Sequence, residues 1–116
     1  MKKCEQSRDD LKEIFLDNIG IAYDLMKDDY MKQSPDELWE NCFDISLKRG
    51  FYMFLVYKSQ RATKSELQYL QKKSIFNDLL DEYYNGVYKQ NYEDYEQLIR
   101  DYIKKQKKME QTGDMQ

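Results

Sequence analysis

The segment from residue 34 to residue 57 constrains the fold most, because it joins a strong helix-start signal to the longest apolar run in the chain. Ser34 can accept a hydrogen bond from the backbone N–H of Glu37 while Glu37 reaches back to the N–H of Ser34, which is the capping-box pattern. Pro35 stands at the first helical position, where its missing N–H costs nothing. We therefore predict a helix that begins after Ser34 and continues to about residue 58.

Apolar residues after this start recur at helical spacing and indicate a buried face. They are Leu38, Trp39, Cys42, Phe43 and Ile45. Trp39 is the only tryptophan in the chain. We predict that Trp39 lies in the core beside Cys42 and Phe43, because large apolar side chains on such a face are usually buried.

An apolar run without periodicity, residues 51–57, follows Gly50. On a continuing helix, Phe51 and Leu55 fall on the side that Glu40 makes polar. This arrangement predicts a helix end enclosed by its neighbours. The alternatives are an apolar surface patch for a protein partner and a short strand, although no second strand-like run exists to pair with it.

The composition predicts one all-α domain over residues 1–116, a compact bundle of four to five helices. One proline and four glycines argue against a loop-rich or all-β chain. No apolar run approaches the ~20 residues that a membrane span needs. The start of the chain lacks the apolar stretch of a signal peptide, and the two cysteines lie far apart. We expect a reduced, cytoplasmic protein with frayed ends at 1–6 and 110–116.

Helix-start signals divide the rest of the chain. An amphipathic pattern predicts a helix over residues 7–31. A second capping box, formed by Thr63 and Glu66, predicts a short helix to about residue 72. Ser74 is a candidate N-cap for the helix that follows.

A break is predicted in the last forty residues, because two apolar stripes there do not share a face. The stripe of residues 92–103 is rotated from that of residues 75–88 by roughly 100°, about one residue's turn. We place the break near residues 89–91, with Asn91 as a new N-cap. Asn85-Gly86 is the alternative position.

Charge is distributed in bands, although the net charge is only −3. Residues 5–47 hold twelve acidic and four basic side chains. Residues 48–73 hold one acidic and seven basic side chains, and residues 74–103 hold seven acidic and two basic ones. Four lysines follow between residues 104 and 108. This banding indicates either pairing of the bands within the fold or a partner with a mixed surface.

The residues expected of an enzyme are missing from the sequence. There is no histidine, and no glycine-rich phosphate-binding motif occurs. Asp36, Glu40 and Asp44 share one helix face, but a helical metal site of that kind also uses histidine, so we predict a solvated face. We therefore expect no enzymatic activity, no cofactor and no metal.

Tyrosine is unusually frequent, with eleven in the chain and six between residues 83 and 102. They suit either the wet rim of a helical bundle or a recognition surface, since tyrosine is enriched at interface hot spots. Tyr88 and Tyr92 flank the predicted break and have least reason to be buried. We predict these two as partner-binding residues, with Phe51 and Leu55 as the apolar alternative.

Nucleic-acid binding is the alternative function. Lys58, Arg61 and Lys64 would contact phosphates, and a helix over residues 63–73 would be the recognition element. The chain as a whole is acidic and would be repelled by phosphates. We therefore expect no binding to duplex DNA, even at low salt.

The segment from residue 34 to residue 103 resembles a small helical domain-of-unknown-function family from gut-associated Gram-positive bacteria and their mobile elements. The matching residues are Pro35, Glu37, Phe43, Leu80, Tyr84, Tyr95, Ile99, Asp101 and Ile103. The basic residues 60–64 depart from the family's more acidic pattern. The resemblance implies no activity, and it implies a phage or mobile-element accessory protein. We therefore expect a non-enzymatic interaction protein that occupies a surface on a larger protein, including a CRISPR nuclease; a homodimer is a further possibility.

Overall fold

The computed structural model describes residues 6–114, and within that range the fold is all-α with no strand. This confirms the predicted fold class. The described residues form six helices, two of them short: α1 (Arg8–Met31), α2 (Pro35–Glu40), α3 (Cys42–Arg61), α4 (Lys64–Gln68), α5 (Ile75–Asn85) and α6 (Tyr92–Asp114).

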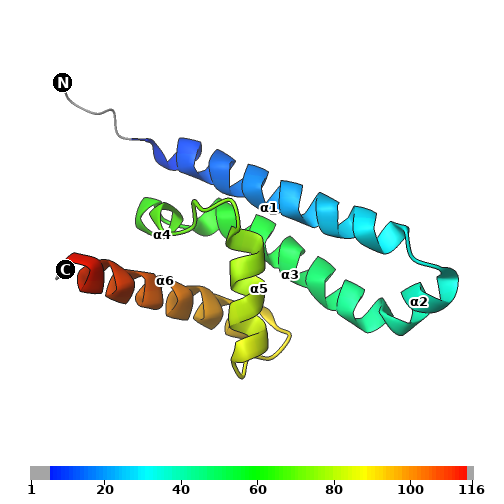
Figure 1. The fold of residues 1–116 in the computed structure, drawn as a ribbon. Helices are drawn as coiled ribbons and strands as arrows, with labels where there is room; N and C mark the ends of the chain where they lie inside the picture. The colour runs from blue at the N-terminus through cyan, green and yellow to red at the C-terminus, as the bar shows by residue number, and fades with distance from the viewer. Residues whose placement is uncertain (1–5, 115–116) are drawn as a thin grey trace.

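Two long helices form the frame of the molecule. Figure 1 shows α1 lying antiparallel to α3, with α2 at the turn between them. Helix α5 crosses this pair, and α6 then runs back beside the C-terminal half of α3. The remaining half of the α1–α3 hairpin extends beyond α5 and α6 at one end (Figure 1).

The core surrounds the C-terminal half of α3. Phe51, Phe54 and Leu55 are completely buried there. Phe51 packs against Phe76 of α5 and Tyr95 of α6, with ring centroids 6.3 and 5.1 Å away. Within residues 51–57, Phe51, Phe54 and Leu55 are therefore enclosed, as predicted, whereas Met53 and Tyr57 face outward and are exposed. Phe51 and Leu55 have no exposed surface for a partner to contact.

The prediction that Trp39 is buried is wrong. Trp39 is 79% exposed and Phe43 is 72% exposed, and Cys42 is exposed as well. Helical spacing marks an apolar face correctly, but it does not tell whether another element covers that face. Here α5 and α6 pack on the far half of α3, so the half that follows residue 41 keeps its outer side uncovered (Figure 1).

Helix starts agree closely with the sequence. Ser34 and Thr63 both form the predicted capping boxes, and Ser7 forms a further one with Asp10. At Ser74 the helix also begins as predicted, but the hydroxyl donates to the Asp78 carboxylate at 3.0 Å and makes no hydrogen bond to the backbone.

Helix ends agree less well. The helix predicted from residue 34 is divided at Asn41, whose φ of −97° and ψ of 5° fall outside regular helix, and its second part extends to Arg61. The short helix that follows ends at Gln68 instead of near residue 72, although Leu70 is still buried.

Residues 86–91 separate the last two helices, so the interruption covers both positions considered from the sequence. Asn91 caps α6 as predicted, since its side-chain oxygen accepts from the N–H of Asp94 at 2.7 Å. Helix α6 extends to Asp114, and the expected fraying of residues 110–114 stays a prediction. The same expectation for residues 1–5 and 115–116 lies outside the described residues.

Two aromatic substitutions in the same hairpin should separate core from surface. We predict that Phe51→Ala lowers the free energy of unfolding by about 3–5 kcal/mol, as for other large core truncations. Trp39→Ala should change it by less than about 0.5 kcal/mol, because an exposed side chain loses little packing. Urea unfolding followed by circular dichroism measures both. If Trp39→Ala lowers the free energy of unfolding as much as Phe51→Ala does, the tryptophan is buried.

Candidate interaction surface

Residues 20–46 form a projecting arm, and none of them is buried. The arm comprises the C-terminal half of α1, all of α2 and the start of α3. It nevertheless exposes large apolar side chains, which are Ile21, Leu25, Met31, Trp39 and Phe43. An element that has no buried side chain yet displays aromatic residues is typical of a binding surface.

An exposed apolar stripe runs from the arm along α3. We call it the outer stripe, and its large members are Trp39, Phe43, Met53 and Tyr57, which are 79, 72, 54 and 42% exposed. Trp39 lies on α2, before the break at Asn41, and from Phe43 onward the exposed Ser46 and Gly50 complete steps of three and four along α3. Such steps keep side chains on one face of a helix.

A polar network ties the arm together from within. The Asp44 carboxylate accepts hydrogen bonds from Tyr30 of α1 at 2.8 Å and from Tyr84 of α5 at 2.7 Å. Lys48 lies 3.1 Å from the same carboxylate and donates to the Tyr30 hydroxyl at 2.9 Å. Three helices therefore meet at one carboxylate.

The pKa values of this network follow from its contacts. Partial burial opposes ionisation of Asp44, but the hydrogen bonds from Tyr84, Tyr30 and Lys48 outweigh it and hold its pKa below the ordinary value. Burial, then the bond to Asp44 and the charge of that carboxylate, raise the pKa of Tyr84 to about 12. The Asp44 carboxylate therefore stays charged and Tyr84 stays protonated at neutral pH.

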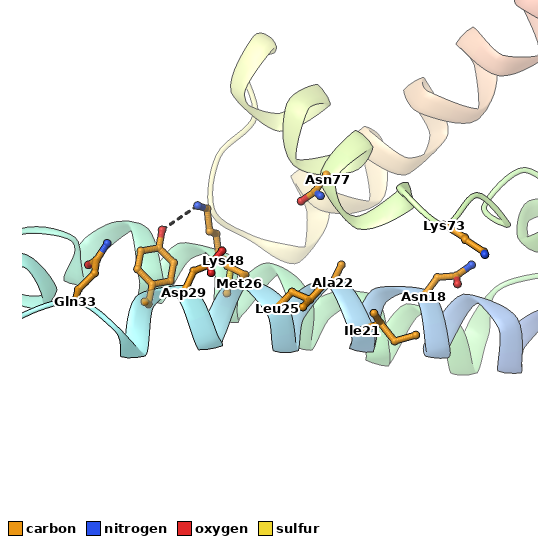
Figure 2. A pocket seen from close by; sticks show the side chains of 11 residues that line it. Asn18, Ile21, Ala22, Leu25, Met26, Asp29, Gln33, Lys48, Lys73 and Asn77 are labelled. Carbon is orange, nitrogen blue, oxygen red and sulfur yellow. Dashed lines mark hydrogen bonds between the residues drawn. The ribbon is translucent and has the colours of Figure 1, made fainter.

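A groove of about 710 Å³ lies on another side of the arm. Figure 2 shows Ile21, Leu25 and Met26 along α1, with Asn77 and Lys73 across from them. Polar side chains from three elements share its rim, so the groove is of mixed character. The outer stripe lies on the opposite side of α3 from Lys48, which also lines this groove.

The two tyrosines predicted as partner-binding residues differ in their surroundings. The Tyr88 hydroxyl donates to Asp101 at 2.6 Å, and burial and this bond raise the pKa of Tyr88. Its role is to join the 86–91 connection to α6. Tyr92 is 49% exposed and packs against Phe54 and Tyr57, with ring centroids 5.1 and 5.3 Å away. Tyr92 therefore borders the outer stripe, whereas Tyr88 is an internal contact.

The basic residues proposed for nucleic-acid contact do not form an open cationic surface. Lys58 is buried and pairs with Glu66 at 3.2 Å and Glu96 at 2.9 Å. Arg61 lies 5.7 Å from the ring centroid of Tyr57, and Lys64 is half-buried. Lys58 thus joins three helices and has its charge matched inside the fold.

Sequence reasoning missed Met53 and Tyr57 and misassigned Trp39 and Phe43. The steps of four and three residues were readable from the sequence, but they describe a shared face and not its exposure. Only the positions of α5 and α6 show which half of α3 stays open.

Charge on the arm is strongly negative. Between residues 24 and 44 there are seven carboxylates and two lysines. No group of cysteines, aspartates and glutamates in the described residues could hold a metal ion. Among the described helices, none is long and apolar enough to cross a membrane.

These features define a small all-α protein with an acidic, aromatic arm. Comparison with protein-family models, curated protein sequences and solved structures found no match to this chain. The resemblance noted from the sequence therefore stays a prediction.

The ion pairs of Lys58 should contribute to stability. Lys58→Met leaves Glu66 and Glu96 together without a cation. We predict that it lowers the free energy of unfolding by up to about 3 kcal/mol. This loss is smaller than for fully buried pairs, because both carboxylates contact water. Glu66 has a pKa below its ordinary value of 4.5, as its hydrogen bonds to Thr63 and the charge of Lys58 outweigh the effect of burial.

The pH dependence provides a second measurement of the same contact. A lowered pKa means that the stability from Glu66 is fully present above pH 4.5 and is lost as the pH falls through its folded-state pKa. Urea unfolding between neutral and acidic pH should show this loss in the natural chain and a smaller one in Lys58→Met. Equal pH dependence in both proteins would contradict it.

Proposed function

We propose that this chain is a non-enzymatic protein-binding protein that docks through its acidic arm and outer stripe on a surface of a larger protein. The observation that carries the proposal is the exposure of Trp39 and Phe43, at 79 and 72%. Tryptophan is among the residues most enriched at interface hot spots, and it contributes most binding free energy when it becomes fully desolvated.

The fold leaves the apolar surface of Trp39 and Phe43 in contact with water. Burying apolar surface contributes roughly 25 cal/mol per Å², and aromatic side chains offer up to about 150–250 Å² each. Two such side chains, four residues apart, can fill neighbouring pockets on one partner. Leaving them exposed brings the isolated chain no folding energy, which supports a role in binding.

The chemistry of the partner follows from charge. With seven carboxylates and two lysines between residues 24 and 44, the arm complements a basic protein surface. Long-range attraction speeds the encounter, while desolvated anchors determine the residence time. Nucleic-acid-binding channels of nucleases are basic surfaces of this type. Together with the resemblance to mobile-element accessory proteins, this makes a host defence nuclease, such as a CRISPR nuclease, the candidate partner.

Nucleic-acid binding, the alternative considered from the sequence, has no specific observation in its favour. Its three residues would have to form one open basic surface, and Lys58 already pairs with two carboxylates. Arg61, which lies over Tyr57, is better placed to border the outer stripe.

Paired aromatic substitutions test the proposal. Trp39→Ala with Phe43→Ala should abolish binding to the partner, or weaken it at least about a hundredfold, because losing a hot-spot side chain costs about 2 kcal/mol or more. The melting temperature should stay almost unchanged. Met109→Ala, which removes an exposed apolar side chain from α6, outside the arm and the outer stripe, is the matched control and should keep full binding.

Two measurements apply in sequence. Copurification from the native host with mass spectrometry compares what the natural chain, the double variant and the control retain. DNA cleavage by the host's CRISPR nuclease, assayed with each protein added, then tests the candidate partner. Undiminished partner binding by the double variant would disprove the role of the stripe. Uninhibited cleavage in the presence of the natural chain would exclude this nuclease.

A further inference from the structure

We infer that the groove along α1 is a second docking site and that its occupant is a basic amphipathic helix of a partner protein. The groove lies on the opposite side of α3 from the outer stripe, so it is a separate surface. The inference rests on the proposed function in one respect, because both require a protein-binding chain. It adds the secondary structure and the charge of the segment that the groove binds.

The floor of the groove is an apolar face that the fold leaves open. Ile21 and Leu25 lie one helical turn apart on α1, and each is 62% exposed. Ala22 and Met26 lie beside them and are half-buried (Figure 2). These two continue the face of the completely buried Phe15, at steps of seven and four residues. The groove is therefore an extension of the core past the point where α5 crosses the hairpin (Figure 1).

The walls of the groove favour a helix as the occupant. From Asn18 to Tyr30 the lining follows α1 over roughly 18 Å, and the other lining residues come from α3, α5 and the connections between helices. Backbone groups inside a helix bond to one another, so these walls offer no strand edge to which an extended peptide could add. A helix satisfies its own backbone groups and can pack along α1 with about 8–10 Å between the axes.

Polar groups in the lining are largely engaged within the fold. The Asn18 amide donates to the carbonyl of Gln71 at 3.1 Å, and the Gln33 amide oxygen accepts from Asn41 at 3.0 Å. Lys48 belongs to the network around the Asp44 carboxylate. A small polar ligand would find few unused donors and acceptors here. Apolar side chains of a helix need none, and they match the floor of the groove.

Carboxylates give the α1 side of the groove its charge. Four exposed aspartates lie on α1, and they are Asp17, Asp24, Asp28 and Asp29. Each lies three or four residues from Ile21 or Leu25, and therefore on the same side of the helix. Lys27, the only basic residue of the 17–29 stretch, lies two residues from Leu25 and faces away.

The charge of the occupant follows from this distribution. Two lysines also line the groove, but Lys48 lies 3.1 Å from the Asp44 carboxylate, so the four aspartates outweigh the remaining cation, Lys73. A helix with lysine or arginine on its flank would place those cations against the aspartates while its apolar face covers the floor. Such charge complementarity speeds the encounter and selects against acidic helices.

Binding of a synthetic helix to the full chain tests the inference. The probe is a blocked, fluorescein-labelled peptide of about 15 residues, which spans the groove as a helix. It carries leucines at steps of three and four, with alanines and lysines elsewhere. Fluorescence anisotropy should show saturable one-to-one binding that weakens as the salt concentration rises. A peptide of the same composition with its leucines spread over all faces should bind at least about tenfold more weakly.

Substitutions in the floor should weaken this complex, whereas a matched substitution elsewhere should not. Ile21→Ser combined with Leu25→Ser should raise the peptide dissociation constant at least about tenfold, because both side chains lose the apolar surface that they bury on binding. Met109 is 63% exposed on α6, which matches the exposure of Leu25. Met109→Ser should therefore leave the dissociation constant within about twofold of the natural value.

Charge reversals test the complementarity separately. Asp24→Lys and Asp28→Lys should each raise the dissociation constant by roughly tenfold and make it less dependent on salt, since each turns attraction into repulsion. Glu93→Lys changes the charge equally at an exposed position of α6. It should change the dissociation constant by no more than about twofold.

Several outcomes would overturn the inference. They are no saturable binding, equal binding of the two peptides, and binding that the groove variants leave unchanged. Trp39→Ala with Phe43→Ala should keep peptide binding within about twofold, and a larger loss would assign the peptide to the outer stripe instead of the groove. None of these measurements involves the natural partner, whose retention by the Trp39 and Phe43 variants tests the proposed function. The two proposals can therefore fail separately.

Discussion

The enclosure of the C-terminal half of α3 is the contact on which the rest of the structure depends. Phe51 meets Phe76 of α5 and Tyr95 of α6, and the completely buried Phe15 of α1 belongs to the same cluster. Because these contacts gather at one end of α3, the outer side of its other end, which includes Phe43, stays exposed. The exposed arm is thus a direct consequence of where the core forms.

The helix starts could be predicted because they depend on neighbouring residues in the sequence. The core could be predicted only in part, because burial depends on how the helices pack. A capping box involves four consecutive residues, so Ser34 and Thr63 could be identified from the sequence alone. The burial of Phe51 could be inferred because its apolar run covers several sides of the helix. Trp39 lies on a single apolar face, and whether such a face is buried depends on the number and placement of neighbouring helices.

The candidate site shows the same division between local and distant causes. Tyr88 and Tyr92 were chosen because they flank a break, and the break exists. Only the structure reveals that Asp101 engages Tyr88 while Tyr92 borders Tyr57. Likewise, Lys58 carries the charge expected of a phosphate contact, yet Glu66 and Glu96 reach it from elements that the sequence could not place.

An arm without a buried side chain still needs a source of rigidity, and polar and aromatic contacts supply it. Tyr23 stacks on Tyr52 with ring centroids 4.2 Å apart, which joins α1 to α3. Closer to the tip, the Asp44 carboxylate connects Tyr30 and Tyr84. These contacts hold the two helices in register without using Trp39 or Phe43. A surface that is rigid before binding loses less conformational entropy on association. More of the free energy gained by burying Trp39 and Phe43 against a partner is then available for recognition.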